Sequence, residues 1–209
     1  MIRVPYRSVR HIELLASRLL EEYCHAQEPV LEPPVPVEEI LERHLRLALS
    51  LESLERLMPG HQVLGALDVS KREVLVDTSL DPEEFPDREG RYRFTLAHEI
   101  GHWRMHRSLY RAPGALALHN LTSRSCDSCR RVERQADCFA ACLLMPRAMV
   151  QRLWLGYCGL ADFSHSCGPL IRHEPPTSEQ LVETLAIDFG VSLCAMRIRL
   201  QELNLLGIG

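Results

Sequence analysis

The segment from Arg91 to His106 constrains the fold of this 209-residue chain more than any other stretch. It contains His98-Glu99-Ile-Gly-His102, in which three residues separate two histidines. If the segment is a helix, these histidines lie about 40° apart around its axis and about one turn apart along it. Their imidazoles can then bind one ion, and zinc accepts neutral imidazole nitrogens readily. The sequence therefore predicts a helix that carries a pair of metal ligands.

Glu99 follows the first histidine and would flank the same face of the helix. A carboxylate there can take a proton from a water molecule that attacks a carbonyl carbon, so Glu99 is the candidate catalytic base. A five-residue pattern with three fixed positions can also arise by chance. The apolar run before the motif, together with Gly101 and Trp103, indicates instead a helix packed into a core with one polar stripe.

A catalytic zinc site needs a third protein ligand and leaves one position for water. His106 continues the four-residue spacing, but it would lie about 12 Å along the helix axis from His98. Zinc–nitrogen bonds are only about 2 Å long, so His106 is excluded as a ligand of the same ion. We expect His106 to line a groove wall or to lie at the surface.

The better candidate for the third ligand lies in the segment 131–146, which is predicted to form a helix ended by Pro146. Glu133 and Asp137 fall on one stripe of this helix. Glu133 can supply a carboxylate ligand, and Asp137 can accept a hydrogen bond from the second nitrogen of a liganding histidine. A pair of acidic residues at this spacing is also common on a solvated face. The strongly apolar run that follows in the same helix favours the metal site.

The two motifs together resemble the ImmA/IrrE family of metallo-endopeptidases. The similarity rests on Arg-Phe-Thr-Leu-Ala before His98, and on Glu133-x-x-Ala-Asp137-x-Phe-Ala-x-x-Leu-Leu-Met-Pro146; it extends over roughly residues 35–205. The resemblance implies a small zincin-like fold, with His98, His102 and Glu133 as ligands of Zn²⁺ and Glu99 as base; Mn²⁺ is an alternative metal. Family members typically cleave a helix-turn-helix repressor and so derepress stress-response or mobile-element genes. A protein substrate of this kind is therefore the expected partner.

We expect an α+β, mostly helical fold: a minimal zincin-like domain with a small antiparallel sheet and a C-terminal helix-turn-helix-like pair of helices. Residues 1–34 would form an N-terminal helix and a proline-rich linker, 35–155 the metallopeptidase domain, 156–176 an irregular connection and 177–209 the helical pair. These boundaries follow the helical repeats, the prolines and the loss of pattern between them.

Two short apolar segments, 62–69 and 73–78, flank Ser70-Lys-Arg72 and predict a β-hairpin. The first of them is a candidate edge strand that could bind extended substrate by strand addition, although an ordinary place in the sheet is an equal alternative. Residues 107–130 lack periodicity and predict a long loop over the site that could gate substrate. His119 in this loop could stabilise an oxyanion, a role that few loop histidines have.

Composition places the chain among soluble globular proteins, with 46% apolar and 25% charged residues. A net charge of -4 gives no general attraction to nucleic acid. We find no apolar run of the roughly 20 residues that span a bilayer and no secretory signal, so we expect a cytoplasmic protein without membrane contact.

Eight cysteines should then be mostly reduced. Cys126 and Cys129 could form a loop clip or redox switch. Cys138 and Cys142, on the face away from the metal, are favoured as unpaired buried thiols. A second metal site made by all four is a further alternative.

A rival interpretation is a DNA-binding regulator that keeps the metal as a structural or sensing element. Two helices joined by Gly190-Val-Ser192 near the C-terminus resemble a helix-turn-helix. A recognition helix needs basic residues, and this one offers only Arg197 and Arg199. We therefore expect core packing or partner docking, and no direct DNA binding. A partner-binding protein with an idle peptidase site is the other rival, and the intact motif argues against it.

Overall fold

The structure, a computed structural model, describes residues 4–27, 31–57, 63–110, 116–120, 127–158 and 177–206. The α-helices are α1 (Val9–Gln27), α2 (Val37–Glu39), α3 (Glu89–Met105), α4 (Asp127–Leu144), α5 (Arg147–Tyr157), α6 (Ser178–Phe189) and α7 (Leu193–Glu202). The strands are β1 (Ala48–Glu52), β2 (Val63–Asp68), β3 (Glu73–Asp77) and β4 (Leu116–Asn120). Short helical turns are η1 (Ile40–His44), η2 (Glu55–Leu57), η3 (Thr78–Leu80), η4 (Pro86–Arg88) and η5 (Arg107–Leu109).

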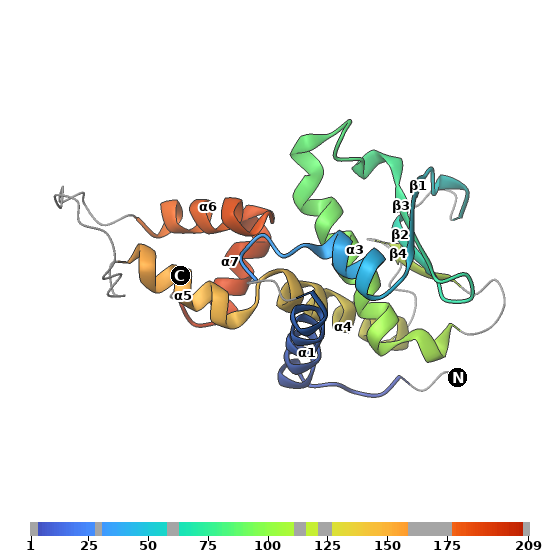
Figure 1. Cartoon of the computed structure of the whole chain (residues 1–209), viewed down its shortest axis with the longest axis horizontal. Helices are drawn as coiled ribbons and strands as arrows, with labels where there is room; N and C mark the ends of the chain where they lie inside the picture. Colours follow the sequence, from blue (N-terminus) through green and yellow to red (C-terminus); the bar gives the residue numbers. More distant parts are fainter. Residues whose placement is uncertain are drawn as a thin grey trace.

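Helices α3 and α4 cross at the centre of the molecule, with the sheet on one side and α5 to α7 on the other (Figure 1). The described residues are mostly helical with one small sheet, which confirms the α+β prediction. The predicted end of α4 is confirmed, because Pro146 lies just after its last residue; α4 begins at Asp127, however, four residues before the predicted start at 131, and η4 leads into α3. None of the described helices combines the length and apolar character that crossing a bilayer requires.

The four strands lie in the order β1-β3-β2-β4. The predicted hairpin is confirmed, because β2 and β3 pair antiparallel around a turn in which Arg72 has φ 57°. β1 pairs with β3 in parallel, however, so the sheet is mixed and the prediction of an antiparallel sheet was wrong for this strand. β3 therefore lies between β1 and β2, although it follows both of them in the sequence.

The predicted substrate-binding edge strand is not an edge. β2 pairs with β3 on one side and with β4 on the other, so its backbone is already used within the sheet. β4 lies inside the stretch 107–130 that was predicted to be a loop. A strand of five residues is too short to show a clear alternation in the sequence, and only its pairing with β2 reveals it.

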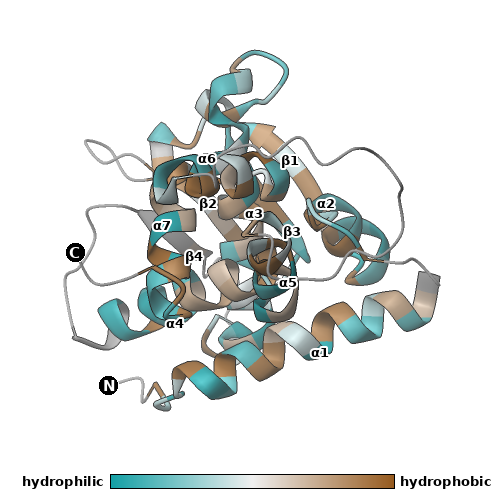
Figure 2. Ribbon diagram, turned by 90° about the vertical axis from the view of Figure 1, so that its left-hand side faces the viewer, coloured by the Kyte–Doolittle hydropathy of each residue, from teal (hydrophilic) through white to brown (hydrophobic). Residues whose placement is uncertain are grey.

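Helix α1 packs against α4 and so belongs to the same hydrophobic core as the central crossing. Its inward stripe is fully or almost fully buried and consists of Ile12, Ala16, Leu19, Leu20 and Tyr23. Figure 2 shows the matching alternation of hydrophobic and hydrophilic positions along this helix. The predicted N-terminal helix within residues 1–34 is confirmed as α1, whereas the domain boundary at residue 34 remains a prediction.

The C-terminal helices begin and end through local capping. Thr177 and Gln180 form a capping box at the start of α6, and the Ser192 side chain accepts a hydrogen bond from the Ala195 N–H at the start of α7. Between them, Gly190 has φ 59°, a left-handed conformation that favours glycine. The predicted helix-turn-helix-like pair is therefore present in outline.

Arg93 holds α3 to two other parts of the chain. Its guanidinium donates to the Gly190 carbonyl (3.1 Å) and to the Val35 carbonyl (2.7 Å). Farther along α3, a Cβ atom at Gly101 would lie 3.3 Å from the Ala136 Cα of α4. The absence of a side chain at Gly101 therefore lets α3 and α4 approach closely, as the sequence predicted. This close crossing brings the polar residues of the two helices together.

A candidate metal centre at the crossing of α3 and α4

Three predicted ligands converge where α3 crosses α4. The Nε2 atoms of His98 and His102 lie 2.9 Å apart, and the Glu133 carboxylate lies 3.2 Å from the first and 3.5 Å from the second. Two atoms that bind one zinc ion at about 2 Å each cannot be more than about 4 Å apart. All three distances meet this condition, so this group could hold one metal ion.

The three candidate ligands differ in how far they are exposed to solvent. Both histidine side chains have an exposed fraction of 0%, and Glu133 has 23%. Burying a polar group without a partner costs free energy. A helix pair that served stability alone would therefore not bring three such groups together. Glu133 is therefore the ligand that a molecule in solution can approach.

Asp137 lies one turn beyond Glu133 and supports the first histidine. Its carboxylate is 2.9 Å from His98 Nδ1, the ring nitrogen that points away from the cluster. Burial by itself would lower the pKa of His98, but the hydrogen bonds to Asp137 and Glu133 outweigh it and raise the pKa to about 10. Burial would raise the pKa of Glu133, yet the two histidines beside its carboxylate hold it well below its ordinary value. The predicted contact between Asp137 and a candidate ligand is thus present.

His106 is buried, with an exposed fraction of 1%, so the prediction that it lines a groove or lies at the surface was wrong. Its Nδ1 lies 3.3 Å from His102 Nδ1, and its Nε2 lies 2.9 Å from the Gln135 side-chain oxygen. The metal-sized cluster does not include it, which agrees with its exclusion as a ligand. Burial lowers the pKa of His102 and lowers that of His106 to about 4, because burial disfavours the charged form of each ring.

Glu99 is fully buried between α3 and the sheet. Within the described part of the chain, neither of its carboxylate oxygens has a hydrogen-bond partner. Burial raises its pKa, His98 opposes the shift and the negative Glu133 adds to it, and the net result is a pKa of about 8. A carboxylate in such surroundings accepts a proton more readily than an ordinary glutamate.

Gly65 on β2 makes room for Glu99. A Cβ atom at this position would lie 2.9 Å from Glu99 Oε1 and 2.6 Å from Thr95 Cγ2, closer than real side chains come. The sequence shows a glycine within an apolar strand, but it gives no sign of which side chain approaches it. Gln135 was missed for the same reason, because a glutamine in a helix carries no signal of its partner.

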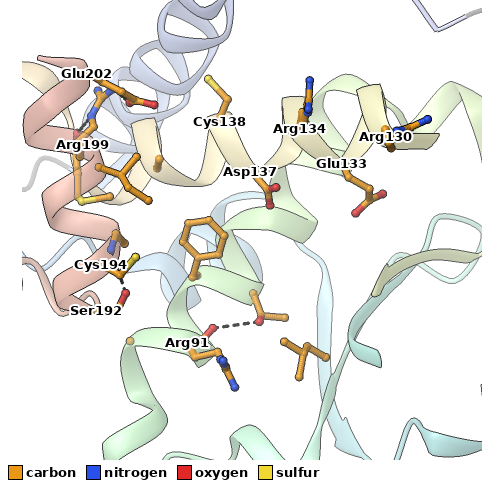
Figure 3. A pocket seen from close by; sticks show the side chains of 18 residues that line it. Arg91, Arg130, Glu133, Arg134, Asp137, Cys138, Ser192, Cys194, Arg199 and Glu202 are labelled. Atoms are coloured by element: carbon orange, nitrogen blue, oxygen red, sulfur yellow. Dashed lines mark hydrogen bonds and ion pairs between the residues drawn. The ribbon is translucent and has the colours of Figure 1, made fainter. Parts of the chain in front are cut away.

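A groove of about 760 Å³ runs along α4 beside the cluster. Glu133 and Asp137 point into it, and Ser192 and Cys194 of α7 lie at its other end (Figure 3). The apolar part of its lining consists of Leu64, Phe94, Ala141, Met145, Ala195 and Ile198. Helix α7 and its N-cap therefore supply one wall of a groove that reaches the candidate metal centre.

Two of the four cysteines singled out in the sequence can be described. Cys138 is half-buried and Cys142 is buried, and both are free thiols, as predicted. Burial and the neighbouring Cys142 raise the pKa of Cys138, whereas Cys138 lowers that of Cys142. Cys126 and the side chains of Cys129 and His119 lie outside the described residues, so their predicted roles stay predictions.

Two imidazoles from one helix turn and a carboxylate from a second helix form the ligand set of mononuclear metallohydrolases. A comparison with known families matches residues 86–201, more than half of the chain, to the IrrE N-terminal-like domain of peptidase family M78. The chain belongs to this family of metallopeptidases. No curated protein matches it significantly.

Proposed function

We propose that this protein is a zinc-dependent endopeptidase. The observation that carries the proposal is the approach of His98 Nε2, His102 Nε2 and the Glu133 carboxylate within 2.9 to 3.5 Å of one another. These two nitrogens and one carboxylate fit zinc, and Mn²⁺ is a weaker match because it prefers oxygen ligands. Membership of a metallopeptidase family supports the same assignment.

His98, His102 and Glu133 would hold the ion, which when bound supplies a Lewis acid for the peptide carbonyl. Glu99 takes the proton of the attacking water and then delivers it to the leaving amide nitrogen. Its burial keeps bulk water from competing for that proton and fits a pKa near the working pH. Asp137 fixes the ring of His98 by accepting its Nδ1–H.

The substrate we propose is a protein, and specifically a helix-turn-helix repressor whose cleavage derepresses stress-response or mobile-element genes. Resemblance to the ImmA/IrrE family supports this identity. The groove along α4 supports a protein as the class of substrate, since its apolar lining and its extension beyond Glu133 to α7 suit a polypeptide. Such a substrate would place the enzyme in the cytoplasm.

The contacts of α7 do not favour the rival role of DNA binding. Arg197 is paired with Glu179, with one hydrogen bond of 3.0 Å. Arg199 is buried and donates to Glu13 (2.8 Å) and to the Met145 carbonyl (3.1 Å). Both cations that could read a duplex are thus engaged within the chain.

The Glu99→Gln variant tests the proposal. We expect purified wild-type protein to contain one zinc ion per chain, and the variant to keep the zinc while losing cleavage by about 10²- to 10⁴-fold, the usual contribution of a general base. The variant should also retain uncleaved substrate in a pull-down that mass spectrometry can identify. A variant that binds zinc and cleaves as fast as the wild type would exclude Glu99 as the base.

A further inference from the structure

A chain of three polar contacts lies behind His102, on the side away from the candidate metal. His102 Nδ1 faces His106 Nδ1 at 3.3 Å, and His106 Nε2 faces Gln135 Oε1 at 2.9 Å. Gln135 Nε2 in turn donates to the Pro5 carbonyl at 3.0 Å. All three side chains have exposed fractions of 5% or less, so bulk solvent does not reach them.

The chemistry of these groups allows only one direction for the protons. The Pro5 carbonyl can only accept, so it must face the NH₂ of the Gln135 amide, and the amide oxygen must face His106. His106 then carries its proton on Nε2 and presents a lone pair at Nδ1. That lone pair can accept only if His102 carries its own proton on Nδ1. The Nε2 lone pair of His102 is therefore left to face His98 and Glu133.

The N-terminal segment that carries the Pro5 carbonyl is held in place by contacts of its own. Val4 is buried with an exposed fraction of 6%, and its carbonyl accepts from Arg131 of α4 at 3.3 Å. These contacts hold the N-terminal segment against α4 and so fix the Pro5 carbonyl that orients the Gln135 amide.

We propose that His106 and Gln135 are positioning residues that hold His102 in the Nδ1–H tautomer, with its Nε2 lone pair presented to the metal. This inference rests on the proposed metal site. The two candidate ligands are then supported differently: His98 by the carboxylate of Asp137, and His102 by a buried neutral pair of side chains that ends on a backbone carbonyl. A neutral support orients the ring without adding a further negative charge beside Glu133 and Asp137.

The direct test is the tautomer of His102 in the metal-free protein, read from long-range ¹H–¹⁵N imidazole spectra. We expect the Nδ1–H form in the wild type, and a mixture of forms in His106→Phe, which keeps a ring but removes the acceptor. His44→Phe is the matched control, because His44 is half-buried, pairs with Glu22 and does not belong to the metal-sized cluster. A wild-type His102 that carries its proton on Nε2 overturns the proposal, even if the variants fail to fold.

Zinc affinity, measured by chelator competition, gives the second test. His106→Phe and Gln135→Met should bind zinc about 10- to 100-fold more weakly than the wild type, the usual effect of removing a partner of a metal ligand. His44→Phe and the exposed Gln201→Met should bind as the wild type does. Folded variants with unchanged affinity contradict the positioning role. A wild type that does not bind zinc contradicts the proposed function instead, and the spectra of the metal-free protein still decide the direction of the protons.

Discussion

The α3–α4 crossing and the α6–α7 pair are both pairs of packed helices, but they differ in how many polar side chains they bury and in which apolar side chains they expose. The crossing buries His98, Glu99 and His102 completely. The C-terminal pair buries the charged side chain of Arg199, caps its two helices through side chains that act within three residues, and exposes Ile187 (79%) and Ile198 (51%) to solvent. Burial of polar groups costs free energy that a purely structural helix pair avoids. The difference indicates that the crossing carries the candidate ligands and the candidate base, and that the α6–α7 pair contributes an exposed apolar surface.

The largest effect should come from the ligand that α4 contributes. Glu133→Ala should lower zinc affinity by more than about 100-fold, since even a residue that only supports a ligand changes affinity by about 10- to 100-fold. Glu179→Ala, which removes an exposed acidic residue of α6, should leave zinc affinity unchanged. Isothermal titration with zinc compares the two, and equal affinities would mean that the crossing has no special role.

Two glycines are needed for different reasons: Gly65 because side chains pack closely against it, and Gly190 because its backbone is left-handed. Gly65→Val should destabilise the fold by about 1–3 kcal/mol because its side chain meets Thr95 and Glu99. It should also lower the cleavage rate by displacing Glu99. Gly190→Ala should destabilise by about 1–2 kcal/mol through its left-handed backbone, yet keep wild-type zinc affinity. Urea unfolding and cleavage assays measure both effects, and wild-type stability with wild-type cleavage for Gly65→Val would contradict the close approach.

The groove wall formed by α7 can be tested with two exposed isoleucines. Ile198→Arg should lower kcat/KM by about tenfold, the scale of one lost apolar contact in a binding pocket, because Ile198 lines the groove. Ile187→Arg makes the same change on α6 outside the groove lining and should have no effect. The assay uses the protein captured by Glu99→Gln as substrate. Equal values for the two variants would show that α7 does not contact substrate.

The smallest effect is expected at a helix cap. Ser192→Ala removes the side chain that accepts from the Ala195 N–H and should lower the free energy of unfolding by about 1 kcal/mol. Zinc affinity should stay at the wild-type value, because the cap lies in the helix pair and not at the crossing. Thermal melts with and without zinc give both quantities. A marked loss of zinc binding would mean that the two regions are coupled.

Local patterns allowed the sequence to predict the helices and the hairpin correctly. Pro86 lies just before α3 and Pro146 just after α4, and the caps at Thr177 and Ser192 are side-chain signals that act within three residues. The sequence did not predict β4 or the parallel pairing of β1, because pairing between distant strands leaves no periodic trace in a five-residue segment.

For the candidate site too, the sequence predicted the local features and only the tertiary structure shows the distant contacts. The spacing of His98 and His102 on one helix already places their rings together, and the stripe of Glu133 and Asp137 points to a partner. Only the tertiary structure decides that Glu133 comes within 3.2 Å of His98, that Gly65 lies against Glu99, and that His106 is buried against Gln135. Helical geometry fixes neighbours within one turn, whereas contacts between residues 29 or more positions apart depend on how close two helices can pack. Gly101 permits that close packing, and the fold determines which side chains then meet.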